Sequence, residues 1–384
     1  MQPTGVIETG KATNALVDLL KFGQSVWLDY IRRDLITSGE LKRLIDEDGL
    51  RGMTSNPTIF EKAIASGNSD YLDLLRELKA QANLDAKARF EALEIRDIQD
   101  AADILRPVFV STKGRDGYVS LEVSPYLGRD TQGTISEARA LWKAVGRENI
   151  MVKVPGTAEG VPAFQQLISE GININVTLLF AQDMYQQIAE AYIVGLEQLA
   201  AQGGNIAKMA SVASFFISRI DTAADNIIGA RLKTSKDAKE QEQLKSLQGK
   251  VAIANGKLAY QRYLKIFGSD RWKKLAAQGA QTQRVLWAST GTKNPSYSDV
   301  MYVEDLIGPD TVNTIPPATL DAFRDHGHPR ASLVENVPAA EQTMQTLAKV
   351  GISIDEITDK LTNDGIRSFE EAFDKLLEAI KKNS

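Results

Sequence analysis

The sequence predicts an α/β protein folded as a (β/α)8 TIM barrel with helical insertions. Eight short segments of strand-like composition recur along the 384 residues, and helical patterns separate them. Most of these segments are nearly continuous apolar runs, which is typical of strands buried on both faces of a parallel sheet. The chain also lacks a Gly-rich nucleotide-binding loop. Eight alternations without such a loop favour a closed barrel over a doubly wound sheet.

The strands and helices are predicted in strict alternation. The strands are expected at 26–31, 50–56, 117–123, 150–155, 174–180, 208–216, 284–290 and 312–319. Helices are expected at about 133–146, from Gly160 onward, and from Phe180 to Ala200. The pair Asn56-Pro57 is expected to end the second strand and open a helix, because proline fits a first helical turn and restricts the residue before it.

Two segments between strands, about 57–116 and 217–283, are much longer than the others. A (β/α)8 barrel typically needs roughly 250 residues. The insertions account for most of the excess, so we expect residues 1–384 to form one enlarged barrel domain. The second insertion contains a stretch of alternating charge that predicts a solvated helix. A dimer contact, a partner site and a lid are all open interpretations of its role.

The C-terminus predicts an amphipathic helix at about 369–381. Its apolar residues fall on one helical stripe, and Ser368 and Glu371 have the spacing of a capping box. We expect this helix to pack on the exterior of the barrel.

The composition limits the possible chemistry. The chain has no Cys, and its only two His are His326 and His328. Thiolate nucleophiles, disulfides and cysteine-ligated metals are therefore excluded. Two imidazoles supply only part of a zinc site, so we interpret them as ordinary surface histidines and expect no metal site. The stretch GTK at 291–293 does not match a P-loop. An enzyme of this composition must rely on Lys, carboxylates and hydroxyls.

The charge pattern argues against two classes of partner. The net charge is -5, from 45 basic and 50 acidic residues that are interspersed along the chain. This balance predicts no nucleic-acid partner and no anionic-membrane surface. No apolar run approaches the length of a bilayer-spanning helix, and residues 1–14 lack the apolar core of a signal peptide. We expect a cytoplasmic protein.

Lys153 is the most conspicuous polar residue in a predicted strand. It lies inside the run IMVKVPG. An ammonium there must be desolvated or paired, and desolvation favours the neutral, nucleophilic amine. A charged residue that protects a sheet edge and a structural ion pair are alternative interpretations.

Two carboxylates and several amides and hydroxyls are predicted at the carboxyl ends of the strands, where barrel enzymes have their active sites. Asp29 follows the run VWL, and Glu122 follows VSL. Either carboxylate alone could cap a helix or pair with an arginine. Together with a strand lysine they suit imine chemistry, in which an amine attacks a carbonyl and carboxylates move the protons. The other polar residues at these ends are Thr54, Asn56, Asn175, Thr177, Ser214 and Ser289.

At these residues the sequence resembles the transaldolase family. The resemblance rests on TSNPTIF (54–60), LEVSP (121–125), VKVPGTAEGVPAF (152–164) and NVTLLF (175–180), and on the order of all eight strands. It extends from about residue 15 to the C-terminus and is closest to the longer bacterial branch, some members of which are fused to glucose-6-phosphate isomerase. The resemblance implies a barrel of the class I aldolase type.

The resemblance also implies a role for each site residue. Lys153 matches the lysine that forms a Schiff base with the donor ketose, and Asp29 matches the acid/base of carbon–carbon cleavage. Glu122 matches the acid/base that works through a water held together with Thr177. The positions matching those that hold the dihydroxyacetone fragment or support the lysine are Thr54, Asn56 and Asn175. The positions matching the pocket wall and the phosphate site are Ser214, Phe216, Arg219 and Ser289.

The sequence departs from the family pattern at the phosphate site. Shorter members read A-S-F-R-N after the seventh strand, whereas this chain reads ASTGTKN at 288–294. Lys293 is expected to replace the missing arginine, as a point charge rather than a bidentate fork. Phe215 also stands where shorter members have Pro. Small aldolases of the superfamily carry Gln in place of Glu122, so the glutamate argues for transfer over simple aldol cleavage.

The sequence therefore predicts a metal-independent transferase without a cofactor. The implied reaction moves a dihydroxyacetone unit from sedoheptulose 7-phosphate or fructose 6-phosphate to glyceraldehyde 3-phosphate or erythrose 4-phosphate, in the non-oxidative pentose phosphate pathway. The expected partners are sugar phosphates, and the expected assembly is a monomer or homodimer. Two alternatives are a Schiff-base aldolase that releases free dihydroxyacetone and a non-catalytic barrel subunit. The second alternative predicts loss of the lysine or a carboxylate, and all three are present.

Overall fold

A computed structural model describes residues 14–65, 69–80 and 84–383. The eight strands form a closed parallel barrel in sequence order, which confirms the predicted fold class. Residues 1–13, which include most of the segment that argued against a signal peptide, lie outside the described residues. The strands are β1 Gln24–Asp29, β2 Gly52–Thr54, β3 Tyr118–Glu122, β4 Ile150–Pro155, β5 Ile174–Leu179, β6 Ser211–Phe216, β7 Arg284–Ala288 and β8 Thr311–Ile315.

Burial and proline explain where the strands lie and end. Every residue of β4, β5 and β6 is buried, as their continuous apolar runs predicted. The last strand ends at Ile315, earlier than the predicted 312–319, because Pro316 and Pro317 follow it and proline cannot donate to the ladder. Helix α15 begins at Pro317 instead.

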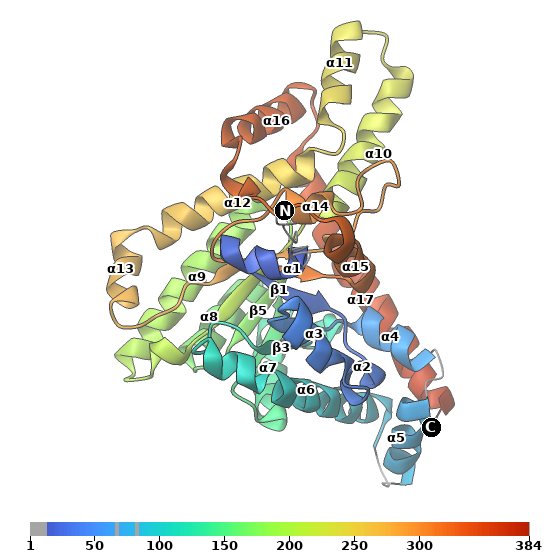
Figure 1. Ribbon diagram of the computed structural model, residues 1–384, viewed down its shortest axis with the longest axis vertical. Helices are drawn as coiled ribbons and strands as arrows, with labels where there is room; N and C mark the ends of the chain where they lie inside the picture. The colour runs from blue at the N-terminus through green and yellow to red at the C-terminus, as the bar shows by residue number, and fades with distance from the viewer. Residues whose placement is uncertain (1–13, 66–68, 81–83, 384) are drawn as a thin grey trace, which may run out of the picture.

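Helices surround the barrel, and segments distant in sequence lie side by side there (Figure 1). The expected helices after β3, β4 and β5 are confirmed as α7, α8 and α9, and α4 begins at Pro57 as predicted. The helices are α1 Ala15–Leu19, α2 Arg33–Thr37, α3 Glu40–Asp48, α4 Pro57–Ala65, α5 Ser69–Ala80, α6 Ala86–Ser111, α7 Thr131–Val145, α8 Gly160–Ser169, α9 Gln182–Ala201, α10 Ser218–Thr234, α11 Ala238–Leu247, α12 Val251–Phe267, α13 Asp270–Ala276, α14 Met301–Glu304, α15 Pro317–His326, α16 Val337–Lys349 and α17 Ile354–Asn383.

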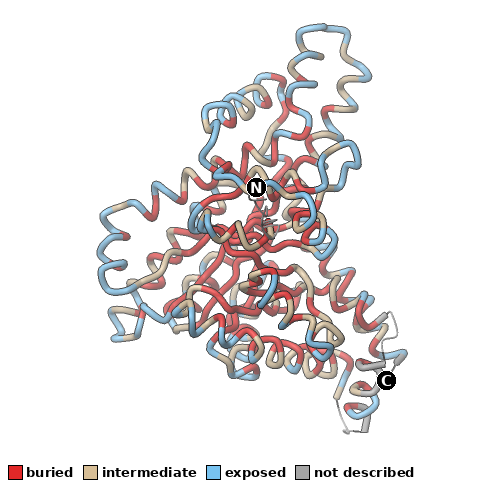
Figure 2. The backbone as a smooth tube through the Cα atoms, viewed as in Figure 1, coloured by how far each residue is buried: buried red, intermediate tan, exposed pale blue. Residues whose placement is uncertain are grey.

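The two long insertions are helical. The first contains α4, α5 and α6, and the second contains α10 to α13. In Figure 2 the barrel is mostly buried, whereas α11, which carries part of the alternating charges, is exposed along much of its length. No helix within residues 14–65, 69–80 and 84–383 has both the length and the apolar composition needed to cross a bilayer.

The C-terminal helix differs from its prediction in length and position. Helix α17 begins at Ile354, so Ser368 and Glu371 lie in its interior and form no N-terminal capping box. It also does not pack only on the exterior, because Phe369 lines a cavity at the carboxyl end of the barrel, called the mouth below. The amphipathic stripe identified the buried side of this helix but not the surface that covers it.

Two residues at the mouth have backbone conformations that are rare for non-glycine residues. Leu178 in β5 has φ 60°, and Ser289 directly after β7 has φ 57°. The pairing of β5 with β6 shifts in register between Val176 and Leu179. Bulges of this kind redirect side chains next to functional sites. This one spans Thr177, which faces the cavity.

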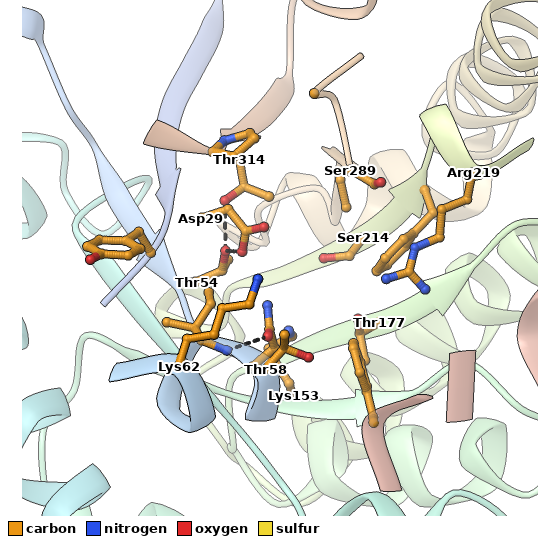
Figure 3. A pocket seen from close by; sticks show the side chains of 18 of the residues that line it. Asp29, Thr54, Thr58, Lys62, Lys153, Thr177, Ser214, Arg219, Ser289 and Thr314 are labelled. Atoms are coloured by element: carbon orange, nitrogen blue, oxygen red, sulfur yellow. Dashed lines mark hydrogen bonds between the residues drawn. The ribbon is translucent and has the colours of Figure 1, made fainter. Parts of the chain in front are cut away.

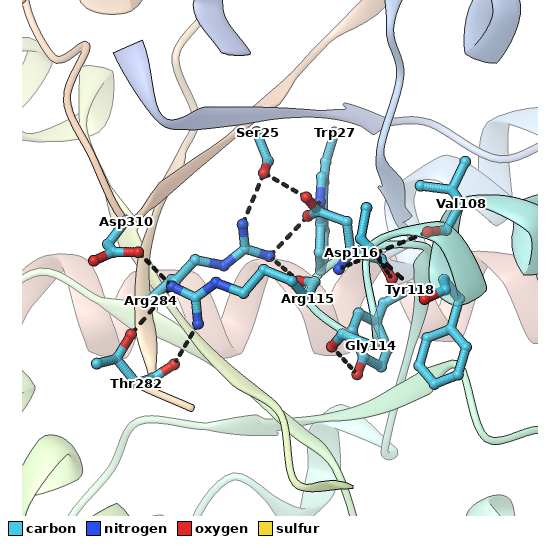
Figure 4. A network of polar contacts seen from close by, with 12 residues as sticks. Ser25, Trp27, Val108, Gly114, Arg115, Asp116, Tyr118, Thr282, Arg284 and Asp310 are labelled. Atoms are coloured by element: carbon cyan, nitrogen blue, oxygen red, sulfur yellow. Dashed lines mark hydrogen bonds and ion pairs between the residues drawn. The ribbon is translucent and has the colours of Figure 1, made fainter. Parts of the chain in front are cut away.

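The amino end of the barrel, called the floor below, is closed by a network of charges that is buried at Arg284 and Asp116 and reaches the surface at Asp310 (Figure 4). Arg284, at the start of β7, is 4% exposed and donates to Ser25 Oγ at 2.7 Å and to Asp116 Oδ1 at 2.8 Å. Asp116 also accepts from the Trp27 indole at 3.2 Å. Arg115 donates to Asp310 at 2.6 Å. The network thus joins β1, β7 and the segments before β3 and β8.

Candidate active site

A cavity of about 590 Å³ opens at the mouth of the barrel. In Figure 3, Asp29 and Thr54 lie on one side of it, Ser214 and Arg219 lie on the other, and Lys153 lies between them. The predicted site residues that line it are Asp29, Thr54, Asn56, Lys153, Thr177, Ser214, Phe216, Arg219, Ser289 and Lys293. Glu122 and Asn175 do not line it. They lie beside Lys153 in the strand register.

Lys153 is buried in β4 with its amine at the cavity. The residue is 5% exposed, and Nζ donates to the backbone oxygen of Ser55 at 2.9 Å. Nζ is also 3.3 Å from Glu122 Oε2, in an ion pair whose geometry is not that of a hydrogen bond. Because the barrel is closed, β4 has no free edge, and a role in protecting a sheet edge is excluded. The amine is therefore both paired and accessible from the cavity.

Asp29 ends β1 and pairs in register with Thr54 of β2. Thr54 Oγ1 donates to Asp29 Oδ1 at 2.8 Å and lies 2.8 Å from Thr314 Oγ1. Since Thr54 has one hydroxyl proton, Thr314 must be the donor in the second bond. Burial raises the pKa of Asp29, and Lys153 opposes the shift most strongly. A carboxyl with a raised pKa is suited to exchange protons near neutral pH.

Glu122 ends β3 and pairs in register with Lys153 of β4. Its side chain is 7% exposed, and burial raises its pKa while Lys153 lowers it. Among the described residues, Oε2 of Glu122 and Oγ1 of Thr177 are buried oxygens without a hydrogen-bond partner. Such oxygens are uncommon in folded proteins and are typical of sites that bind something further.

Asn175 and Asn56 have positions fixed by local hydrogen bonds. Asn175 is fully buried, donates to Ser120 Oγ at 3.1 Å and accepts from Ser214 Oγ at 2.7 Å. Asn56 Oδ1 accepts from the Ile59 amide at 3.1 Å and so caps the first turn of α4. Asn175 thus orients Ser214, which does reach the cavity.

The far wall of the cavity is cationic. Arg219 is at the start of α10, and its guanidinium carbon lies 5.3 Å from the centre of the Phe216 ring. Burial lowers the pKa of Arg219, and Asp29 raises it. Lys293 comes from the segment after β7, and its positive charge lowers the pKa of the Asp29 carboxyl. The cavity therefore has positive charge on the side opposite the Asp29 carboxyl.

Comparison with known proteins identifies the family of this fold and site. Residues 26–380 match the model of the transaldolase/fructose-6-phosphate aldolase family. The chain belongs to this family. It is 50% identical over 372 residues to a transaldolase of Trichodesmium erythraeum, covering 96% of this chain and 97% of the relative. It is 47% identical over 367 residues to a transaldolase of Thiobacillus denitrificans, covering 96% and 99%.

Several lining residues of this transaldolase-family site were not predicted. Arg32 follows β1, Thr58 and Lys62 lie one turn apart on α4, and Phe369 comes from α17. The four-residue spacing of Thr58 and Lys62 directly after the TSNP motif was a usable signal, because such residues share one helix face. Arg32 had no comparable signal.

The histidines lie away from this site. His326 ends α15, is exposed, and lies 3.0 Å from Asp299 Oδ1, so its interpretation as a surface histidine is confirmed. The hydrogen bonds to Asp299 and Asp325 raise its pKa. In residues 14–65, 69–80 and 84–383, no group of three or more His, Cys, Asp or Glu is placed to hold a metal ion.

One further carboxyl lies behind Glu122. Glu94 of α6 is 4% exposed and lines, with Glu122, a cavity of about 20 Å³. Burial raises the pKa of Glu94 well above its ordinary value, and the Glu122 carboxyl raises it further. The raised pKa favours the neutral form of Glu94, which adds no negative charge beside the Glu122 carboxyl.

Proposed function

We propose that the protein is a transaldolase that transfers a dihydroxyacetone unit through a Schiff base on Lys153. The donor is sedoheptulose 7-phosphate or fructose 6-phosphate, and the acceptor is glyceraldehyde 3-phosphate or erythrose 4-phosphate. One observation carries the proposal. The Lys153 amine is buried at the cavity, 3.3 Å from the Glu122 carboxylate, and Asp29 lines the same cavity.

Imine formation uses Lys153 and Glu122. The neutral amine attacks the C2 carbonyl of the ketose and gives a carbinolamine, whose hydroxyl must leave as water. Glu122 supplies the proton for this step and recovers it when the imine is hydrolysed. The unpartnered oxygens of Glu122 and Thr177 support a water held between them, which relays that proton.

Carbon–carbon cleavage uses Asp29. Its carboxylate takes the proton of the C4 hydroxyl, and the C3–C4 bond breaks. The electron pair of that bond forms the C2=C3 double bond of an enamine, while the π pair of the C=N bond moves to the iminium nitrogen. An aldose phosphate leaves. The enamine then adds to the acceptor aldehyde, and Asp29 returns its proton to the new hydroxyl. Thr54 holds the Asp29 carboxyl in place for both steps.

The remaining residues have binding roles in this proposal. Thr54, Asn56 and Ser214 face the dihydroxyacetone fragment, while Asn175 orients Ser214. Arg219, Ser289 and Lys293 bind the phosphate on the far wall, and Phe216 supports the Arg219 guanidinium. We also propose that the enzyme acts in the cytoplasm and that it is a monomer or a homodimer. Light scattering would distinguish the monomer from the homodimer.

The test is a coupled assay with fructose 6-phosphate and erythrose 4-phosphate. Lys153→Ala should lower kcat by at least about 10⁴-fold, because the covalent nucleophile is lost. Borohydride added with the donor should trap an adduct on the peptide that contains Lys153. An adduct on another peptide, or full activity of Lys153→Ala, would exclude the proposal.

The family also contains aldolases, and product analysis separates the two activities. A transaldolase forms the new ketose at the rate at which the donor disappears. Free dihydroxyacetone at that rate would instead show a Schiff-base aldolase. Glu122, in place of the glutamine of the small aldolases, favours transfer.

A further inference from the structure

The two cations of the far wall are carried by different segments. Arg219 lies on α10, which follows β6, and Lys293 lies in the β7–α14 segment, residues 289–300. Lys293 is exposed, and a lysine is a point charge on a flexible stem. If these residues bind a phosphate together, as in the proposed function, something must fix the spacing of the two segments.

Hydrogen bonds join α10 to the β7–α14 segment at its start. Ser218 Oγ lies 3.0 Å from Ser289 Oγ, and the Ser218 amide donates to the Ser289 carbonyl at 3.0 Å. Ser218 directly precedes Arg219. The left-handed conformation of Ser289 is held by these contacts.

Two aspartates of α10 hold the end of this segment and the helix α14 that follows it. Tyr297 Oη donates to Asp225 Oδ2 at 2.7 Å, and Tyr302 Oη donates to Asp221 Oδ2 at 2.9 Å. Asp221 and Tyr302 are 1% and 2% exposed. We call these four residues the aspartate–tyrosine clamp. Lys293 lies between the clamp and the Ser218–Ser289 contact, so the segment that carries it is fixed on both sides.

Residues at the start of α12, also in the second insertion, bind the other carboxylate oxygens of the two clamp aspartates. The Ala252 amide donates to Asp221 Oδ1 at 2.7 Å, and the Gly249 amide donates to Asp225 Oδ1 at 3.1 Å. Gly249 has φ 66°, and a Cβ at this position would lie 2.8 Å from Tyr297 Cζ. Both the conformation and the close approach of the Tyr297 ring therefore require glycine.

We propose that the aspartate–tyrosine clamp, supported by the Gly249 and Ala252 amides at the start of α12, holds Arg219 and Lys293 at a fixed spacing and so determines selectivity for phosphorylated substrates. The clamp residues are positioning residues, because they act through Lys293. The inference rests on the proposed function and extends it. It also assigns a role to part of the insertion 217–283.

The test compares phosphorylated and unphosphorylated donors in Tyr297→Phe. Erythrose serves as the acceptor with either fructose 6-phosphate or fructose, so that only the donor phosphate differs, and sedoheptulose formation is measured. The ratio of kcat/KM for fructose 6-phosphate to that for fructose should fall about tenfold, the size of one hydrogen bond to a carboxylate. Inorganic phosphate should also inhibit fructose turnover less strongly than in the wild type.

The matched control is Tyr263→Phe. Tyr263 Oη donates to Thr282 Oγ1 at 3.1 Å at the floor, so this variant loses a similar hydroxyl far from the phosphate wall. Its donor selectivity should equal that of the wild type. Asp225→Asn provides a second variant of the clamp if Tyr297→Phe folds poorly.

A double-mutant cycle with Lys293→Ala tests whether the clamp changes donor selectivity through Lys293. If the clamp acts through the lysine, Tyr297→Phe should not lower the selectivity of Lys293→Ala any further. Unchanged selectivity in both clamp variants, or an equal loss with both donors, would overturn the inference. Failure of the proposed function is a distinct result, because the wild type would then form no sedoheptulose from either donor.

Discussion

At the floor of the barrel Arg284 is held by Ser25 and Asp116, whereas the charged groups at the mouth are only partly paired. Each oxygen of the Asp116 carboxylate accepts at least one hydrogen bond. At the mouth, Glu122 Oε2 accepts none from the described residues, and burial raises the pKa of both Glu122 and Asp29. The floor therefore satisfies its charges internally, and the mouth does not.

This difference indicates that the two ends of the barrel contribute to different properties of the protein. A paired buried charge is costly to break and holds the strands in register, so the floor acts on stability. A partly paired group with a shifted pKa is unfavourable for folding but available to a substrate, so we expect the mouth to act on catalysis. Substitutions at the two ends should separate these effects.

The largest expected effect is on catalysis, from Asp29→Asn. The amide cannot take the C4 hydroxyl proton, so kcat/KM should fall by about 10² to 10⁴-fold in the coupled assay. The free energy of unfolding should stay the same or rise, since Asn still accepts from Thr54. Borohydride trapping of the donor should persist, because imine formation does not need Asp29. Activity within tenfold of the wild type would contradict the assigned role.

The next effect is on stability, from Arg284→Met. It leaves Asp116 buried without its counter-charge, which should cost about 3 to 5 kcal/mol of unfolding free energy in urea titrations. The kcat per folded molecule should change little. Adding Asp116→Asn should recover part of the loss. A large fall in kcat at full stability would mean that the floor also serves catalysis.

A smaller effect, from substitution of Glu94 behind the mouth, should be a change in stability that depends on pH. The folded-state pKa of Glu94 is well above its unfolded value, so the folded protein retains this proton as pH rises while the unfolded chain releases it. The stability that the proton contributes is complete below about pH 4.3 and is lost as pH rises toward the folded pKa. In urea titrations, Glu94→Gln should therefore gain stability relative to wild type as pH rises above about 4.3. A constant difference would show that Glu94 does not titrate in this way.

The smallest effect should reveal backbone strain at the mouth. Ser289→Ala and Ser289→Gly both lose the hydroxyl, but only glycine relieves the left-handed conformation. The glycine variant should be more stable than the alanine variant by about 1 kcal/mol, measured by thermal unfolding. Equal stability would mean that Ser289 stores no strain.

The sequence predicted the barrel and most of the site because both depend on local patterns. Buried parallel strands are continuous apolar runs, and the proposed catalytic groups interrupt those runs near their carboxyl ends, as Lys153 and Glu122 do. Closure of the barrel then brings those ends together. That residues 1–384 form one domain stays a prediction, which a single cooperative unfolding transition would support.

The contacts that the sequence did not predict join distant segments. Arg284 and Asp116 are 168 residues apart, and nothing in their local patterns indicates the partner. Phe369 belongs to a stripe that indicated burial, but the stripe does not distinguish the outer wall of a barrel from its mouth. The roles of the twelve site residues rest on the resemblance to transaldolases and on the proposals above.

The position of α17 has a consequence for the order in which the chain folds. The cavity takes Asp29 from β1 and Phe369 from α17, and α17 packs against α4 and α6. Contacts between segments so distant in sequence form slowly, because a long loop must close before they are made. We therefore expect the wall that Phe369 contributes to be among the last parts of the cavity to form during folding.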